Sequence, residues 1–291
     1  MDNQTAELEK VREKKINNLL SIRNLPSIPV VMFEVTKLLE NPKTNANDLG
    51  KIISMDQGLV AKILTVANSP LYGLPRRVST IEFAIVILGF EHIKNIVIAL
   101  SMIEAFKGND SKEIDKKSYW LHSLVTAFAA KRIADDFRYR KSGEAFTAGL
   151  LHDLGISVIQ RFFNPDFLKI VDYVKEKGCD HLTAENQILG INHQDIGQFL
   201  IDKWNLPPIL GDVILHHHDP AKAENKQLSA IVHLADYMTQ KLGIGAFNWD
   251  EFLHFDPFIM EVFNFTDEAD LDSYISKHQD LFLSQIELLE I

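Results

Sequence analysis

Apolar residues recur roughly every three to four positions along most of the chain, which is the spacing of one face of an α-helix. Prolines and short polar clusters end each apolar stretch, and no segment shows the alternation of a half-buried β-strand. The pattern therefore predicts an all-α fold. The expected helices lie at residues 6–22, 30–40, 44–54, 57–68, 81–88, 91–106, 118–137, 145–160, 164–177, 192–204, 206–218 and 228–238.

The polar run at 108–117 (GNDSKEIDKK) carries no apolar period and is the strongest boundary in the chain. We therefore expect two packed parts, an N-terminal helical subdomain at 1–112 and a helical bundle with a C-terminal helical extension at 113–291. The first helix, at 6–22, is either a coiled-coil linker or a helix packed on the domain. Packing is favoured because the heptad is not sustained.

Residues that cap helices mark several of the expected starts. Ser79 and Glu82 have the spacing of a capping box, in which each side chain bonds the other residue's backbone amide. Asn164, followed by a proline and an aspartate, is expected to cap a helix, as is Asn192. Asn68, followed by Ser69-Pro70, is either a simple helix stop or part of a binding site.

The stretch AFTAGLLHDLGISVIQ at 145–160 places two polar residues, His152 and Asp153, among apolar and small ones. We expect one buried helix with this pair in its middle. A carboxylate is costly to bury without a cation or hydrogen-bond donors. Neutral imidazole beside carboxylate suits a divalent transition metal. Such a pair is common by chance, so its value depends on further ligands elsewhere.

Further histidines and an aspartate lie inside apolar, helix-like segments. They are His122, His193, the run His216, His217 and His218, and Asp236. Each one alone is explained more simply as a hydrogen-bonded core residue or a helix end, but together with the central pair they favour a shared metal site. His233 is expected to orient a ligand rather than to be one, and His181 is expected on a surface loop.

The order H…HD…H…HH…D resembles the HD superfamily of metal-dependent phosphohydrolases, in the variant that holds two metals. The first part of the chain is similar to the N-terminal part of the HDOD domain, a bacterial signalling module related to those enzymes. The residues that carry this second resemblance are Leu25, Pro26, Pro29, Asp56, Leu59, Lys62, Ile63, Leu64, Ala67, Asn68, Ser69, Tyr72, Ile81, Ala84, Ile85, Leu88 and Gly89. Together the resemblances cover residues 16–241, and the rest matches nothing recognised.

The resemblance implies a ligand set of two groups. His122, His152, Asp153 and Asp236 would hold one ion, and His193, His217 and His218 a second, with Asp153 placed between them. The family spacing H-H-x-P, which ends here at Pro220, leaves His216 outside, and His193 with Gly197 fits H-x-x-x-G. Mixed histidine and carboxylate ligands suit iron, manganese or zinc. The expected cofactor is therefore a pair of divalent ions.

Three departures weaken an enzymatic interpretation. Ile156 stands where catalytic HD-GYP phosphodiesterases carry a lysine that would meet substrate phosphate. The GYP segment is absent, since the chain reads DPAK at 219–222 after the paired histidines. Ser118 replaces a glutamate found in some relatives, so a third metal is not expected. The resemblance therefore implies a regulatory module whose site need not turn over a substrate.

The composition of the chain limits the classes of partner and the compartments that we expect. A net charge of −10 and a pI near 5.5 argue against sequence-independent binding to nucleic acid or an anionic membrane. One cysteine, Cys179, fits a reducing compartment, and neither a signal peptide nor a membrane-length apolar run is expected, so a cytoplasmic protein is predicted. The Arg76-Arg77 pair is expected to be a solvated loop, with contact to a phosphate or a partner as the alternative.

Three functional hypotheses follow. The favoured one is a signalling module with a metal site that acts through contacts with signalling proteins of unknown identity. The second is a metal-dependent phosphohydrolase acting on a nucleotide or cyclic dinucleotide, with Asp153 as the catalytic residue. The third is an interaction module without metal. The stripe formed by Leu281, Leu283, Ile286, Leu288 and Leu289 is expected to pack on the chain's own core, with a homodimer as the alternative.

Overall fold

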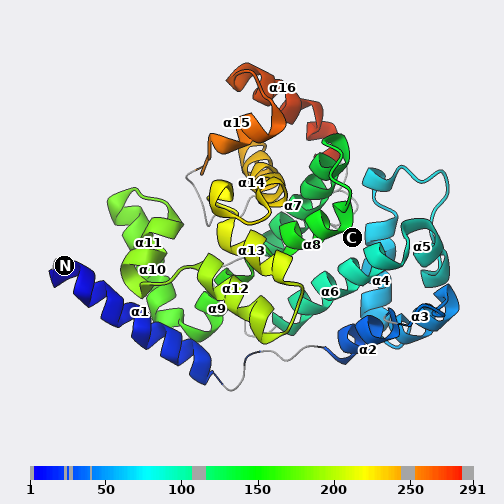
Figure 1. Cartoon of the computed structure of the whole chain (residues 1–291), viewed down its shortest axis with the longest axis horizontal. Helices are drawn as coiled ribbons and strands as arrows, with labels where there is room; N and C mark the ends of the chain where they lie inside the picture. The colour runs from blue at the N-terminus through cyan, green and yellow to red at the C-terminus, as the bar shows by residue number, and fades with distance from the viewer. Residues whose placement is uncertain are drawn as a thin grey trace.

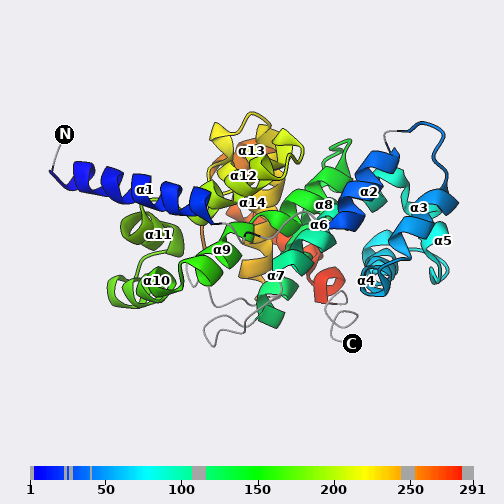
Figure 2. The same cartoon turned by 90° about the horizontal axis from the view of Figure 1, so that it is seen from below.

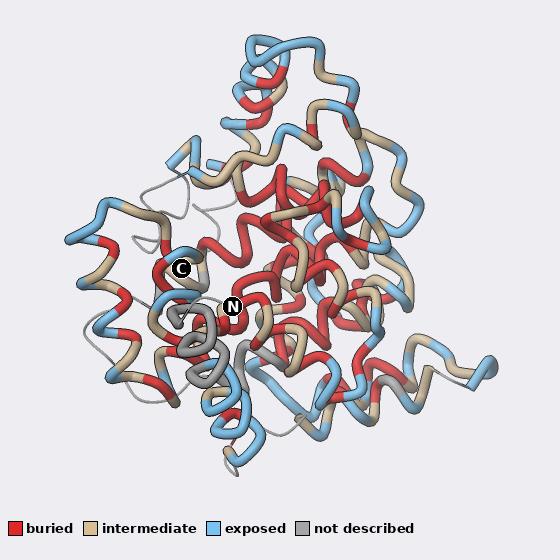
Figure 3. Tube along the Cα trace, turned by 60° about the vertical axis from the view of Figure 1, so that its left-hand side comes forward, coloured by how far each residue is buried: buried red, intermediate tan, exposed pale blue. Residues whose placement is uncertain are grey.

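The computed structural model describes residues 3–22, 25, 29–39, 41–106, 116–243 and 253–283 (Figure 1). Every regular element among these residues is a helix, and none of them forms a β-strand. The all-α fold predicted from the apolar spacing is confirmed. Most buried residues lie in the middle of the molecule, and exposed residues lie mainly around its periphery (Figure 3).

In the first part of the chain, α2, α3 and α5 pack around α4 and α6, whereas α1 lies against α11 (His181–Leu189) of the second part. Its elements are α1 (Asn3–Ser21), α2 (Val30–Leu39), α3 (Ala46–Ile53), α4 (Gln57–Ala67), the 3₁₀ turn η1 (Pro70–Tyr72), α5 (Ile81–Leu88) and α6 (Phe90–Phe106). Their apolar faces bury Leu49, Ile63 and Ile85 in a cluster that also takes in Phe128 and Phe146 from the second part. The two parts therefore share core side chains.

The second part is a bundle in which α7, α8 and α14 pack together at the centre. Its elements are α7 (Lys116–Asp136), α8 (Ser142–Leu151), α9 (Leu154–Phe162), α10 (Asn164–Lys177), α11 (His181–Leu189), α12 (His193–Lys203), α13 (Pro208–His216), η2 (Pro220–Lys222), α14 (Lys226–Lys241), α15 (Phe258–Phe263) and α16 (Glu268–Lys277). Figure 2 shows α10 and α11 at one end of the molecule and α2 to α5 at the other.

The central stretch is two helices rather than the single one expected. Helix α8 ends at Leu151 and α9 begins at Leu154, so the HD pair lies at the junction. Asp153 leaves helical geometry at φ −97° and ψ 12°, which turns the chain between the two helices. The break allows α8 to pack on α7 while α9 packs on α12. Asp153 can thereby face side chains from both neighbours.

Two predicted helix caps are also wrong. Helix α5 is capped by Thr80, whose hydroxyl accepts from the amide of Phe83, and not by Ser79. The Glu82 side chain instead packs against Gly50 of α3. Asn164 is the first residue of α10 and does not cap it. The cap predicted at Asn192 is confirmed, with Asp195 completing a capping box.

Asn68 has a structural part in this fold. Its side-chain amide donates to the carbonyls of Leu64 and Val78, and its side-chain oxygen accepts from the amide of Val78. These bonds tie the end of α4 to the loop that leads into α5. The side chain is thus used within the fold, which favours the structural alternative for this residue.

The first helix packs on its own chain. Leu19 is buried, Lys15 pairs with Asp166, and Arg12 lies 3.9 Å from Asp195. The predicted boundary at 112 lies outside the described residues, as do Ile286, Leu288 and Leu289 of the predicted C-terminal stripe. No single described helix has the length and apolarity of a membrane span, although Ile81–Leu88 and Phe90–Ser101 would meet both criteria as a pair bent by 119°.

A hydrogen bond between Tyr72 and His92 joins η1 to α6. Because His92 is largely buried, we expect the stability of the fold to decrease in acid. Burial, reinforced by the charge of Lys131 and partly offset by Asp135, lowers the pKa of His92 to about 4. The pKa of His92 is therefore lower in the folded chain than in the unfolded chain, where it is about 6.5. Between about pH 4 and pH 6.5 the unfolded chain binds more protons than the folded one. The stabilisation is complete above about pH 6.5 and is lost as pH falls toward about 4.

We therefore expect His92→Gln to lose less stability on acidification than the wild type. Between about pH 7.5 and pH 5 the difference should be about 2 kcal/mol in the free energy of unfolding, measured by urea denaturation. Other titrating histidines cancel because they are present in both proteins. Equal losses would show that His92 does not carry this dependence.

Candidate metal centre

The predicted ligands come from five places in the bundle and meet at its centre. They are His122 on α7, His152 and Asp153 at the α8–α9 junction, His193 at the start of α12, His217 and His218 just after α13, and Asp236 on α14. All are buried. Their nitrogen and oxygen atoms form two groups that share Asp153 as a neighbour.

The first group combines two imidazoles with two carboxylates. His122 Nε2 lies 3.1 Å from Asp236 Oδ1 and 3.8 Å from Asp153 Oδ2. His152 Nε2 lies 3.2 Å from Asp153 Oδ2 and 3.6 Å from Asp236 Oδ1. Ligands about 2.1 Å from a shared ion are separated by roughly these distances. The four atoms therefore have the spacing of one coordination sphere.

The second group contains three imidazoles. His193 Nε2 lies 3.2 Å from His218 Nε2, so the two nitrogens share either a proton or a cation. The Nε2 atoms of His193 and His217 lie 3.6 Å and 3.7 Å from Asp153 Oδ1. Asp153 thus turns one carboxylate oxygen to each group, Oδ2 to the first and Oδ1 to the second.

Hydrogen bonds on the far side of the rings fix which nitrogen faces the centre. His152 Nδ1 donates to the carbonyl of Gly149, and His217 Nδ1 to that of Ile214, both at 2.8 Å. Each ring therefore carries a proton on Nδ1 and turns Nε2 to the centre. Both Nε2 atoms are buried and have no hydrogen-bond donor among the described residues. Such ring nitrogens beside carboxylates fit a divalent metal.

Glu185 orients the ring of His193 and was not predicted as a site residue. Its Oε2 accepts from the backbone amide of His193 at 2.7 Å and from the ring Nδ1 at 2.8 Å. The carboxylate is fully buried. A carboxylate behind a histidine fixes the ring and raises its basicity as a metal ligand.

Gln240 supports Asp236 in a similar way. Its amide nitrogen lies 3.0 Å and 3.1 Å from the two carboxylate oxygens of Asp236, to which it donates. The two residues are one helical turn apart on α14, so their i,i+4 spacing was a signal that could have been used. Tyr119 adds a third support, because its hydroxyl donates to the backbone carbonyl of Asp153 at 3.0 Å.

The remaining histidines have other positions. His233 Nδ1 donates to the carbonyl of His217 at 2.7 Å, so it holds the backbone of that residue and makes no bond to Asp236. His216 turns to the carbonyl of Asp212 at 3.0 Å. His181 is not on a surface loop as expected. It is the first residue of α11 and is buried, and burial, helped by His193, lowers its pKa to about 4.

Two glycines allow the helices around the site to approach closely. A Cβ on Gly155 would lie 2.0 Å from the carbonyl oxygen of His193. The backbone of α12 therefore occupies the space that a side chain at this position of α9 would need. A Cβ on Gly197 would lie 2.5 Å from Cγ2 of Ile214. The contact at Gly155 lies two residues from Asp153 and is made with the backbone of His193.

The electrostatics favour ionised carboxylates beside a protonated His152. Burial lowers the pKa of His152, but the charges of and hydrogen bonds to Asp153 and Asp236 outweigh it and raise that pKa well above its ordinary value. Burial raises the pKa of Asp153, but the charges of His152 and His193 outweigh it and hold the pKa well below its usual range. The pKa of Asp236 is lowered in the same way, against burial, by hydrogen bonds from His122 and His152. Burial, with His152 and His193, lowers the pKa of His217 to about 3. The carboxylates are thus ionised, and His217 is neutral.

Two other predicted positions lie away from the groups. Arg76 and Arg77 are exposed on the loop between η1 and α5. Ile156 is buried in the core of the second part, so the position that carries a lysine in HD-GYP enzymes presents no cation here.

Comparisons with known proteins agree with this architecture. The sequence model of the HDOD domain matches residues 25–220. A crystal structure of an HDOD domain protein of unknown function from Geobacter sulfurreducens is 24% identical, with a TM-score of 0.75 over 95% of this chain and 98% of that one. A proposed phosphohydrolase from Shewanella amazonensis SB2B is 23% identical, with a TM-score of 0.71 over 94% and 98%. These likenesses show the fold.

An uncharacterized protein of Treponema pallidum (strain Nichols) is 25% identical over 218 residues, which are 74% of this chain. They make up 42% of that protein, so the chain spans less than half the length of this relative. Asp236 and helices α14 to α16 lie beyond the residues that match the HDOD model.

Proposed function

The chain belongs to the HDOD family, and from that premise we propose that it is a bacterial-type signal-transduction module that holds two divalent metal ions and acts mainly through protein contacts. The observation that carries the proposal is the position of Asp153, with one oxygen toward each ligand group. A single carboxylate between two such groups is what a bridged metal pair requires.

We assign one ion to His122, His152, Asp153 and Asp236, and the other to Asp153, His193, His217 and His218. Iron, manganese and zinc all suit these donors. When bound, such ions lower the pKa of a coordinated water and polarise phosphoryl oxygens. Glu185 orients the ring of His193, and Gln240 orients the carboxylate of Asp236. Tyr119 holds the backbone carbonyl of Asp153.

The exposed surface of the N-terminal part supports action through protein contacts. Phe83, Val86 and Ile87 form an exposed apolar stripe on α5, and the loop before it carries exposed Arg76 and Arg77. Exposed apolar side chains near basic ones are more typical of a protein-binding surface than of a surface that faces only solvent. We propose that signalling partners are recognised by the subdomain at 1–112, while 113–291 holds the metals. The single Cys179 supports a reducing compartment such as the cytoplasm.

The alternative is a metal-dependent phosphohydrolase acting on a nucleotide or cyclic dinucleotide. It is favoured by the same ligand geometry, in which Asp153 would be the catalytic residue that positions the attacking water. The buried Ile156 counts against it, because no cation meets the substrate phosphate from that position.

Metal analysis combined with a phosphodiesterase assay tests the proposal. Protein purified without chelators should contain about two divalent ions per chain. With manganese or iron added, it should hydrolyse bis(p-nitrophenyl) phosphate and cyclic dinucleotides no faster than an Asp153→Ala variant. A metal content far below one ion per chain would favour a metal-free interaction module. Hydrolysis that Asp153→Ala abolishes would favour the phosphohydrolase.

A further inference from the structure

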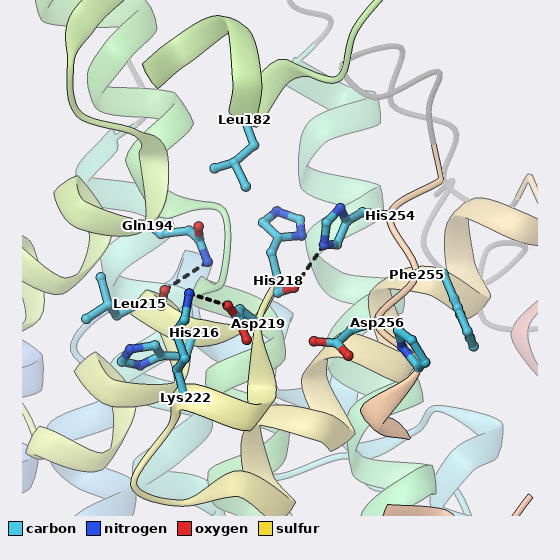
Figure 4. A pocket seen from close by; sticks show the side chains of 11 residues that line it. Leu182, Gln194, Leu215, His216, His218, Asp219, Lys222, His254, Phe255 and Asp256 are labelled. Atoms are coloured by element: carbon cyan, nitrogen blue, oxygen red, sulfur yellow. Dashed lines mark hydrogen bonds and ion pairs between the residues drawn. The ribbon is translucent and has the colours of Figure 1, made fainter. Parts of the chain in front are cut away.

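Four successive backbone carbonyls at the end of α13 each accept a hydrogen bond from a side chain outside that helix. The donors and their carbonyls are Gln194 and Leu215 at 2.8 Å, Ser229 and His216 at 2.9 Å, His233 and His217 at 2.7 Å, and His254 and His218 at 2.9 Å. Figure 4 shows the first and the last of these bonds. The last carbonyls of a helix lack partners within it, and Pro220 has no amide hydrogen with which to continue α13. Side chains from elsewhere therefore hold the backbone of two metal ligands, His217 and His218.

The bond to His218 comes from the C-terminal extension. Residues 253–257, which we call the strap, precede α15 and lie beyond the residues that match the HDOD model. His254 of the strap donates from Nε2 to the carbonyl of His218, and the two rings meet edge to face with their centroids 5.1 Å apart (Figure 4). The strap thus contacts a ligand of the second group directly.

His233 makes a second connection between the strap and the ligand pair. Its Nε2 accepts from the backbone amide of Asp256 at 2.9 Å, and its Nδ1 donates to the carbonyl of His217 at 2.7 Å. A ring nitrogen that accepts from an amide carries no proton, so the ring is neutral and its proton is on Nδ1. The side chain is buried, which shields both bonds from water. The position of the strap is therefore transmitted to both carbonyls.

The first ligand group is supported from other elements. Gln240 of α14 donates to the carboxylate of Asp236, and the carbonyl of Gly149 on α8 accepts from His152. These supports lie on the central helices of the bundle. A change in the strap should therefore affect the second group more than the first.

We propose that the strap positions the second ligand group, with His254 and His233 as positioning residues, so that affinity for the second ion depends on the C-terminal extension. The inference rests on the proposed two-metal function. Because coupling between two sites is reciprocal, binding of the second ion stabilises the strap by the same factor. Leu253 of the strap is exposed, so the effect of an ion in the bundle reaches the surface of the extension.

Zinc titration of the full chain, freed of metal with EDTA and measured against a competing chelator, tests the inference. His122→Ala and His217→Ala assign the two binding events, because each removes a ligand from only one group. His254→Phe keeps a ring but removes the donor, and it should weaken the second event about tenfold and the first by less than about threefold. His254→Gln retains a donor and should bind the second ion within about threefold of the wild type. If packing of the ring were what mattered, the order of the two variants would be reversed.

His278→Phe is the matched control. His278 is another imidazole of the extension, but it bonds α7 instead of the ligand pair, with Nε2 3.0 Å from Asp136 Oδ2. This variant should keep the affinity of the second event within about threefold of the wild type. Equal weakening by His254→Phe and His278→Phe, or weaker binding by His254→Gln than by His254→Phe, overturns the inference and leaves the metal centre standing.

Hydrogen exchange of the unsubstituted chain gives an independent measurement. Saturating zinc should slow exchange of the Asp256 amide, which bonds to His233, about tenfold, because the coupling is reciprocal. In His217→Ala, which retains the first group, zinc should not slow it. Exchange that is unchanged in a chain that binds two ions overturns the inference alone. A chain that binds no zinc overturns the proposed function, and the inference with it.

Discussion

Asp153→Ala is expected to reduce the metal content from about two ions per chain to one or fewer. The carboxylate oxygens lie 3.2 Å and 3.8 Å from His152 and His122 on one side, and 3.6 Å and 3.7 Å from His193 and His217 on the other. Removing the side chain takes a ligand from both groups and the negative charge between two cations. Elemental analysis of protein purified without chelators and freed of loose metal by gel filtration measures the loss.

Asp166→Ala is the control for this experiment. Its side chain is 17% exposed, compared with 12% for Asp153, and it pairs with Lys15 and Lys169 instead of facing histidines. The control should retain the wild-type metal content. If the Asp153 variant also retained two ions, the carboxylate would not bridge them, and the two groups would be independent sites.

The arrangement of helices follows from apolar spacing, but the helix ends depend on contacts across the fold. Ser79 and Thr80 are both competent caps, and the sequence pattern favoured the one with Glu three residues later. In the structure Glu82 packs against Gly50 of α3, so it is unavailable for a capping box. The helix still begins at Ile81, as predicted, but Thr80 caps it. The break at Asp153 likewise reflects packing of α8 and α9 on different partners, which no local pattern reports.

The sequence predicted the candidate metal ligands, but it did not predict the residues that orient them. Resemblance to a known order of ligands identified the residues that converge, because no periodicity reports that distant segments meet. Helix α11 shows why Glu185 was missed. Its buried positions, His181, Ala184, Glu185 and Leu189, have helical spacing, but two of the four are polar. A pattern search for apolar residues therefore predicts a surface there, although the hydrogen bonds from His193 make burial of Glu185 favourable.

Gly155→Ala is expected to destabilise the fold by about 3 kcal/mol, despite the higher helix propensity of alanine. The new Cβ would lie 2.0 Å from the carbonyl oxygen of His193 and 2.8 Å from its Cα, which are backbone atoms that cannot rotate away. Helices α9 and α12 must therefore separate, and the separation also moves Asp153 away from His193. Urea denaturation of the metal-free protein measures the first effect, and metal content measures the second.

Gly211→Ala separates this steric effect from a general effect of adding a methyl group to a buried helix. A Cβ on Gly211 meets its nearest atom, Cγ2 of Ile201, at 3.5 Å, which is ordinary contact. That variant should be unchanged or more stable by up to about 1 kcal/mol, with its metal content intact. If the two substitutions had equal effects on the free energy of unfolding, α9 and α12 would not be in the close contact that brings His193 to Asp153. If Gly155→Ala unfolded more easily but kept both ions, the contact would support the fold without setting the geometry of the metal centre.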